Sequence, residues 1–261
     1  MAGESDLLLG FELHSEEIIR RAIAAGADPA GCIDGKPAVH ILLEMYTRSP
    51  RFAACLRIML EAGATLNDPA LEAVLLDNIL QLTHAIKLDH SSLHRKRSLE
   101  CAYTGLHGVS LLHVAAEYNS LNAAKYLLAQ GVHGDVAAEV DEDGLGGQTP
   151  IFHTVNSNQN NSHEVMELLV ESGVSLDIRL KGLVWGGSFE WETVIYDVSP
   201  ISYAQCGLYF QFHRPDSQVY SNLGYLYQKR YGVPLTVRNV PNKYLFGQEG
   251  LSSKDLTDRR G

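Results

Sequence analysis

The clearest alternation of apolar and polar positions lies in residues 110–131, SLLHVAAEYNSLNAAKYLLAQG. The segment opens on Ser110 and continues into two alanines, small enough for a neighbouring helix to approach closely. Asn119 and Ser120 supply a turn, and leucines and alanines then recur at helical spacing until Gly131. This pattern predicts two short antiparallel helices. Neither helix can bury its apolar stripe alone, so the unit requires copies of itself on both sides.

The pattern recurs along the chain. A second copy begins with GQTPI at residues 147–151, and a weaker one begins with SPISYA at residues 199–204. Predicted helix stops at Gly26, Gly63, Gly131 and Gly173 are separated by about one, two and one repeat lengths of ~33 residues plus small insertions. The double gap predicts a degenerate helix pair in residues 70–90.

These segments resemble the ankyrin repeat, whose pattern runs TPLHxAA, a turn, and then LLxxGA. Ser110 and Leu111 stand at the Thr and Pro positions, and Leu112, His113, Ala115 and Ala116 match. The resemblance, to the bacterial type of the family, implies a mainly α fold: an ankyrin-type α-solenoid of about six helix-turn-helix repeats with β-hairpin loops, two of them elongated. The expected array spans residues 1–232, with an N-terminal cap at 1–34 and a degenerate third repeat at 68–105. Residues 233–261 are expected to form a tail.

Residues 177–198, DIRLKGLVWGGSFEWETVIYDV, predict a long β-hairpin folded at Gly186-Gly187. This fold places Trp185 opposite Ser188, Leu180 opposite Thr193, and Ile178 opposite Ile195. Lys181 then faces Glu192, a favourable cross-strand charge pair. The aromatic side chains would pack on the repeats or form a surface offered to a partner.

The composition of the chain argues against several classes of partner. The formal net charge of −10 argues against nucleic acid and anionic membrane surfaces, which are bound mainly by Lys and Arg. The compact basic run HRKR, residues 94–97, is expected to be a solvated loop or helix end, or alternatively a docking patch for an acidic partner. The four cysteines are widely spaced, the N-terminus lacks a signal-peptide pattern, and no apolar run approaches ~20 residues. We expect a cytoplasmic, monomeric protein with reduced thiols.

Motifs for chemistry are sparse. His113 occupies the His position of the repeat, where the resemblance implies a structural imidazole that bonds the backbone. The other histidines lack metal-ligand spacing, and no nucleophile elbow or phosphate loop occurs, so no cofactor or metal is expected. Glu190 and Glu192 lie on one face of the predicted strand near Trp185 and Trp191, a pattern that could suggest sugar hydrolysis. An enzyme or small-ligand binder that uses this aromatic hairpin is therefore the alternative.

In the ankyrin family, hairpin tips and exposed residues of the inner helices bind partner proteins. The resemblance therefore implies a non-catalytic protein–protein interaction scaffold whose partner is a protein of unknown identity. Carried onto this sequence, the candidate contact residues are Glu117 and Tyr118 in the fourth unit, Asn156 and Ser157 in the fifth, and Asp141, Glu142, Asp143, Trp185 and Trp191 in the hairpins.

Overall fold

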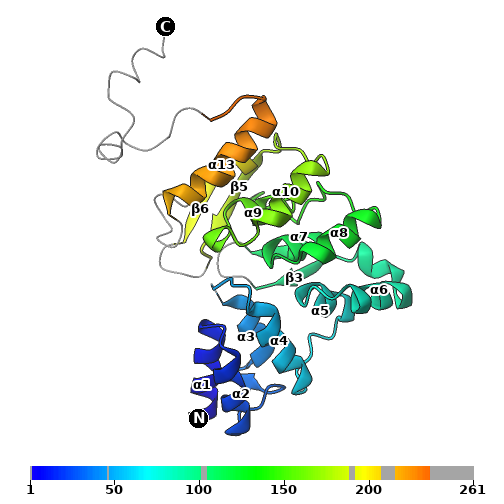
Figure 1. Ribbon diagram of the computed structural model, residues 1–261, viewed down its shortest axis with the longest axis vertical. Coiled ribbons are helices and arrows are strands. Elements are labelled where there is room, and N and C mark those ends of the chain that lie inside the picture. The colour runs from blue at the N-terminus through cyan, green and yellow to red at the C-terminus, as the bar shows by residue number, and fades with distance from the viewer. Residues whose placement is uncertain (1, 46, 101–104, 188–191, 207–214, 236–261) are drawn as a thin grey trace.

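The computed structural model describes residues 2–45, 47–100, 105–187, 192–206 and 215–235. Short helices are connected in antiparallel pairs that stand side by side in a row, from the N-terminal pair to a long final helix (Figure 1). The helices are α1 (Ala2–Glu12), α2 (Glu16–Ala24), α3 (Ala38–Glu44), α4 (Phe52–Glu61), α5 (Pro69–Leu75), α6 (Ile79–Leu88), α7 (Leu111–Glu117), α8 (Leu121–Ala129), α9 (Phe152–Val155), α10 (His163–Glu171), α11 (Pro200–Tyr203) and α13 (Asp216–Tyr231). The predicted mainly α repeat solenoid is confirmed.

Two-stranded antiparallel hairpins connect several of the pairs. They are β1 (Cys32–Ile33) with β2 (Lys36–Pro37), β3 (Arg97–Leu99) with β4 (Leu106–Val109), and β5 (Leu180–Trp185) with β6 (Thr193–Val198). A single bridge between Val140 and Gly146 closes the turn that precedes α9. Two short 3₁₀ helices, η1 (His90–Leu93) and η2 (Asn158–Asn160), complete the described elements.

The helix stops predicted from the sequence are present, and polar side chains cap the helix starts. The Ser15 hydroxyl accepts a hydrogen bond from the Ile18 N–H at 3.4 Å, and the Asp68 carboxylate accepts one from the Leu71 N–H at 3.0 Å. Pro69 fills the first helical position after Asp68, where its missing N–H is not needed. The four predicted glycine stops all have positive φ angles, between 86° and 102°.

Gly131 allows a direct test of such a stop. Its φ is +86°, and a Cβ atom added there would meet nothing within 4 Å, so an alanine would suffer only from the backbone conformation. We expect Gly131→Ala to lower the free energy of unfolding by about 1–2 kcal/mol, measured by urea denaturation. Gly224 in α13 is the matched control: its added Cβ is equally free and its backbone is helical. Gly224→Ala should be neutral or stabilising by up to ~1 kcal/mol, and equal losses in both variants would contradict the assignment.

The row of helices is packed unevenly. Inner helices stack closely from α5 through α7 and α9 to α11, and outer helices from α6 through α8 to α10. The N-terminal pairs also stack, α1 on α3 and α2 on α4. Contact between the second and third pairs is looser, both for α3 with α5 and for α4 with α6. A wide outer groove of about 770 Å³ opens there, bordered by Leu80 and Leu88 of α6, which are 84% and 76% exposed.

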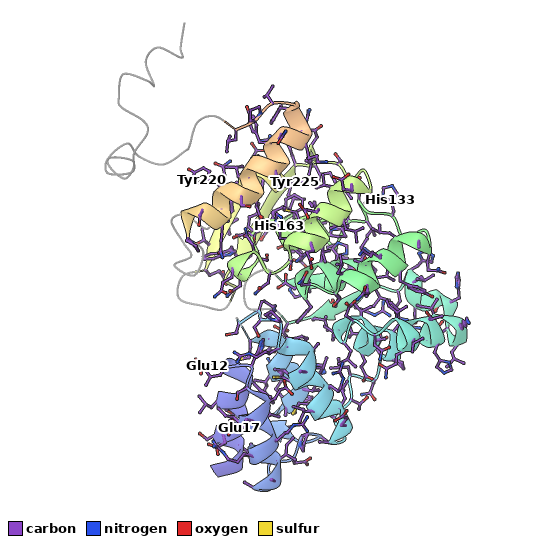
Figure 2. The ribbon with its side chains drawn as sticks, in the orientation of Figure 1. Glu12, Glu17, His133, His163, Tyr220 and Tyr225 are labelled. Atoms are coloured by element: carbon purple, nitrogen blue, oxygen red, sulfur yellow. The ribbon has the colours of Figure 1, made fainter. Side chains whose placement is uncertain are left out.

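The final helix, α13, closes the C-terminal end of the row. Val219, Leu223 and Leu226 are buried, and the fully buried Asn222 donates to the Val155 carbonyl at 3.2 Å. Figure 2 shows Tyr225 of α13 beside His163 of α10, with ring centroids 6.3 Å apart. The Tyr225 hydroxyl donates to Glu171 at 3.1 Å. As expected for a terminal helix, its tyrosines combine an apolar contact with a polar one.

Two features differ from the sequence-based expectation. Helix α1 was not predicted, because LLLG reads as a short apolar run without helical periodicity, yet Leu7 and Phe11 are buried against the next helices. Strands β5 and β6 pair antiparallel, but Leu180 pairs with Val198 and Trp185 with Thr193, five residues from the predicted partners. This register pairs the β-branched run 193–195 with Leu183–Trp185, where Leu183 and Trp185 are buried.

Candidate functional site

Segment 47–51, the end of the connection between α3 and α4, reaches past the third helix pair to the inner helices α7 and α9. Arg48 is the residue that makes this contact, and only 6% of its side chain is exposed. Its Nε donates to the Glu117 carboxylate at 3.1 Å, and its guanidinium carbon lies 4.6 Å from the centre of the Tyr118 ring. The Asn161 side chain donates to the Arg48 carbonyl at 2.6 Å. We call Arg48, Glu117, Tyr118 and His153 the Arg48 cluster.

Contacts that do not involve Arg48 position Glu117, Tyr118 and His153 on their helices. His153 of α9 donates from Nδ1 to the second Glu117 oxygen at 3.2 Å, which leaves the first oxygen for Arg48. The Tyr118 hydroxyl donates to the Leu43 carbonyl at 2.9 Å, and its ring lies 4.7 Å from that of Phe52. A carboxylate and an aromatic face held in this way are the two groups that a guanidinium prefers.

Two hollows flank the cluster. One, of about 20 Å³, has room for about one water molecule and is lined by His153, whose Nε2 has no hydrogen-bond partner in the described part of the chain. The other, of about 230 Å³, lies between segment 48–53, the end of α5 and the turn after α7. Asp77, Glu117 and Asn119 line it, and the Asn119 Oδ1 lacks a partner among the described residues. The Asp77 carboxylate caps α8, because it accepts from the N–H groups of Asn122 and Ala123. The Asn119 Oδ1 is therefore the acceptor that this hollow leaves open among the described residues.

The predicted contact residues of the fourth and fifth units are more enclosed than the sequence suggested. Glu117 and Tyr118 are partly buried, because segment 47–51 covers them. Asn156 lines the small hollow, and Ser157 is buried with its hydroxyl accepting from the Ser162 N–H at 3.1 Å. The expected exposure of Ser157 is wrong, because this hydroxyl joins η2 to the start of α10.

The acidic turn formed by Asp141, Glu142 and Asp143 is exposed, as expected for a hairpin tip. The Asp141 carboxylate accepts from the N–H groups of Asp143 and Leu145, at 3.0 and 2.8 Å, which fixes the turn. Lys181 donates to the Asp143 carbonyl, so it does not form the predicted pair with Glu192. Beside the turn lies a hollow of about 470 Å³ lined by Glu100, Glu139 and Asp141.

The aromatic hairpin differs most from the expected surface. Trp185 is only 3% exposed, because the observed register directs it into the core with Leu183. The expectation that Trp185 is available to a partner is therefore wrong. Trp191, Phe189 and Glu190 lie outside the described residues. The predicted pairing of Trp185 with Ser188 is wrong, because Trp185 pairs with Thr193. Glu192 is exposed, so the buried carboxylate that would favour the hydrolase alternative is not found at that position.

Other polar groups singled out by the sequence have structural roles. The His113 Nδ1 accepts from the Ser110 N–H at 3.1 Å, and its Nε2 donates to the Gln148 carbonyl at 2.9 Å. This imidazole bonds the backbone, as the resemblance implied, and through Gln148 it joins two successive units. Burial is the main reason that the pKa of His113 falls to about 3. Burial also raises the pKa of the Cys55 thiol to about 11, far from that of an activated nucleophile.

The basic run 94–97 is neither a fully solvated segment nor a free docking patch. The side chain of Arg97 is 5% exposed and binds Asp68 through Nε at 2.7 Å. Arg95 binds Asp89 at the surface, and Lys96 donates to the Ala137 carbonyl. Among the described residues, no three His, Cys, Asp or Glu side chains are arranged to hold a metal ion. No helix in the described ranges is long and apolar enough to cross a membrane.

Sequence reasoning missed Arg48 and His153 as parts of a site. Arg48 lies in an irregular connection, where no periodicity marks a residue as buried. His153 follows Phe152 in the short helix α9 and gave no signal beyond its place in the repeat.

Comparison with protein-family models agrees with the repeat pattern. The family model described as "Ankyrin repeats (3 copies)" matches residues 71–180. Among solved structures, the chain resembles an ankyrin repeat domain from Acinetobacter baumannii with 15% sequence identity and a TM-score of 0.38. That alignment covers 85% of this chain and 98% of the other. No curated protein matches the sequence at a significant level.

Proposed function

Because the chain is an ankyrin repeat protein over residues 71–180, we propose that it is a non-catalytic scaffold that binds a partner protein through its hairpin turns and inner-helix surface. In this proposal the array extends over residues 1–232 as about six units, with a cap at 1–34 and a degenerate unit at 68–105. The chain acts as a monomer in the cytoplasm. The predicted tail at residues 233–261 lies outside the described residues from residue 236 onward.

The observation that carries the proposal is the exposed acidic turn, Asp141–Asp143. The Asp141 carboxylate fixes the turn by accepting from the N–H groups of Asp143 and Leu145, and the turn lies beside a hollow lined by further carboxylates. A fixed cluster of one charge sign speeds association with an oppositely charged surface and selects for it. With a chain of net charge −10, the partner surface that fits this turn is basic.

Neutralising the turn tests the proposal. In Asp141→Asn/Glu142→Gln/Asp143→Asn, the amide introduced in place of Asp141 keeps an acceptor oxygen for the turn, so the fold is preserved while the charge is lost. We expect about tenfold weaker recovery of bound partners from a native extract at low salt. The matched control, Glu17→Gln/Glu61→Gln/Glu164→Gln, removes three exposed charges from outer helices; Figure 2 shows Glu17 on the N-terminal helices. Equal losses in both triple variants, or a loss in neither, would contradict a role for the turn.

A further inference from the structure

The Arg48 cluster consists of two parts that are attached to the fold differently. Glu117, Tyr118 and His153 are held on α7 and α9, which stack closely on one another. Arg48 belongs to a connecting segment of the N-terminal pairs, which contact the third pair only loosely. The receiving groups thus lie on closely stacked helices, while the arginine that fills them comes from a connection whose own helix pair packs more loosely on the array.

The contacts of the receiving groups match the chemistry of a guanidinium. Glu117 presents one oxygen to it, because His153 occupies the other. Tyr118 presents its ring face at cation–π distance. The adjoining hollow of about 230 Å³ adds the Oδ1 of Asn119, which has no partner among the described residues, whereas the Asp77 carboxylate in the same wall already accepts from Asn122 and Ala123. The buried Nε2 of His153 is a further acceptor without a partner in the described part of the chain. A donor-rich cation fits this set of acceptors better than a neutral or anionic group does.

We propose that Glu117, Tyr118 and His153 form an arginine-binding site for a partner protein, and that Arg48 occupies it in cis until the partner's arginine displaces segment 47–51. This inference deepens the proposed function and rests on it: it names the partner residue that the inner-helix surface recognises. It also explains why two predicted contact residues, Glu117 and Tyr118, are covered. The covering segment mimics the ligand and suppresses binding of weaker partners, because any ligand must first compete with an intramolecular arginine.

The experiment uses the full chain and a defined probe. Arg48→Ala vacates the site, and N-acetylarginine N-methylamide supplies the missing side chain in trans. The citrulline analogue, which has nearly the same shape and no charge, is the matched control ligand. We expect the melting temperature of the variant to rise saturably, by about 2–4 °C at a probe concentration tenfold above its Kd. The wild type, whose site is filled, should not respond, and neither should the variant with the citrulline analogue.

Further variants keep the test decisive. Arg48→Ala/Glu117→Gln should lose the response to the arginine probe, since Glu117 supplies the ion pair. If Arg48→Ala is too unstable to purify, Arg48→Met keeps the apolar stem of the side chain and takes its place. An equal response in the single and double variants, or no response in either, overturns the arginine site. The acidic-turn experiment is independent of the arginine-probe experiment. If the variant does not bind the arginine probe, the proposed scaffold function still stands. If neutralising the acidic turn has no effect, the arginine probe still decides whether the Arg48 cluster binds a guanidinium.

Discussion

Replacing Arg97 by alanine should lower the free energy of unfolding by about 3–5 kcal/mol, because it leaves a carboxylate uncompensated in a largely buried position. Arg97 binds both oxygens of Asp68, at 2.7 and 3.3 Å, and donates to the carbonyls of Ser92 and Arg95. Burial alone would raise the pKa of Asp68, but the hydrogen bonds from Arg97 and the Leu71 N–H lower it. Urea denaturation at pH 7 measures the loss directly.

The neighbouring Arg95 is a control from the same basic run. Its ion pair with Asp89 joins two side chains that are 48% and 43% exposed, so Arg95→Ala should lower stability by at most ~1 kcal/mol. Asp68→Asn keeps an oxygen for the Leu71 N–H and removes the charge, so Arg97→Ala/Asp68→Asn should be more stable than Arg97→Ala alone. Similar losses for Arg97→Ala and Arg95→Ala would show that the buried pair has no special role.

The ion pair between Arg97 and Asp68 shows which part of the structure the sequence could not predict. Asp68-Pro69 is a local signal, readable because an N-cap and the first helical residue are adjacent in the chain, and the structure bears it out. Arg97 is 29 residues away, and nothing in the run HRKR distinguishes the one arginine that is buried. The periodic leucines and the glycine stops predicted the helix pairs for the same local reason. Partners brought together by tertiary folding were not predictable.

The long hairpin shows the same limit within a single element. Its strands were recognisable from their β-branched and aromatic residues, and Gly186 does have a positive φ of 70°. The two-glycine turn suggested the tightest register, whereas the observed pairs begin only at Trp185 and Thr193. Burial of Leu183 and Trp185 against the repeats decides the register, and this burial depends on neighbouring units that the hairpin sequence does not describe.

The candidate site was predicted in part. Counting from the repeat pattern placed Glu117 and Tyr118 at the end of an inner helix, and both lie in the Arg48 cluster. Their cover was not predicted, because Arg48 belongs to a connection two units earlier in the chain and makes its contacts across 69 residues. Irregular segments carry no periodic signal, so a connection that folds back over the array is visible only in the structure.

Acidification from pH 7 to pH 4.5 should lower the stability of the protein steeply, through two buried histidines. Burial is the first cause that lowers the pKa of His14 to about 4, with Arg48 and Arg51 adding repulsion, and burial likewise lowers that of His113 to about 3. Both histidines have the ordinary value of 6.5 in the unfolded chain. Between pH 6.5 and about pH 4 the unfolded state therefore binds protons that the native state excludes. Stability is fully present above pH 6.5 and is lost by about 1.4 kcal/mol per pH unit for each histidine below it.

The bonding of the two rings explains why they exclude the proton. The His113 Nδ1 already accepts from the Ser110 N–H, so a proton on that nitrogen would face another donor. The His14 ring lies against Phe52 with its centroid 5.6 Å away, and its Nδ1 is 2.9 Å from the Ser49 hydroxyl. Protonation of His14 would place a charge beside segment 47–51, so acid should loosen the N-terminal pairs first. Hydrogen exchange at pH 5 would detect this as earlier loss of protection in α1–α4 than in α7–α10.

Denaturant unfolding between pH 7.5 and 4.5 measures how steeply the free energy of unfolding falls with pH. Histidine variants then show which residue causes the fall. His14→Gln should reduce the loss on acidification by about half, since one of the two titrating groups is gone. His133→Gln, at an exposed position on a loop after α8, controls for the substitution itself and should leave the stability at pH 7 unchanged (Figure 2). Asp68, whose pKa is lowered from 3.8, contributes to the pH dependence mainly below pH 4, outside this window. A stability that stays level from pH 7 to pH 5 would mean that these histidines accept protons in the folded protein, and the buried, neutral state assigned to them would be wrong.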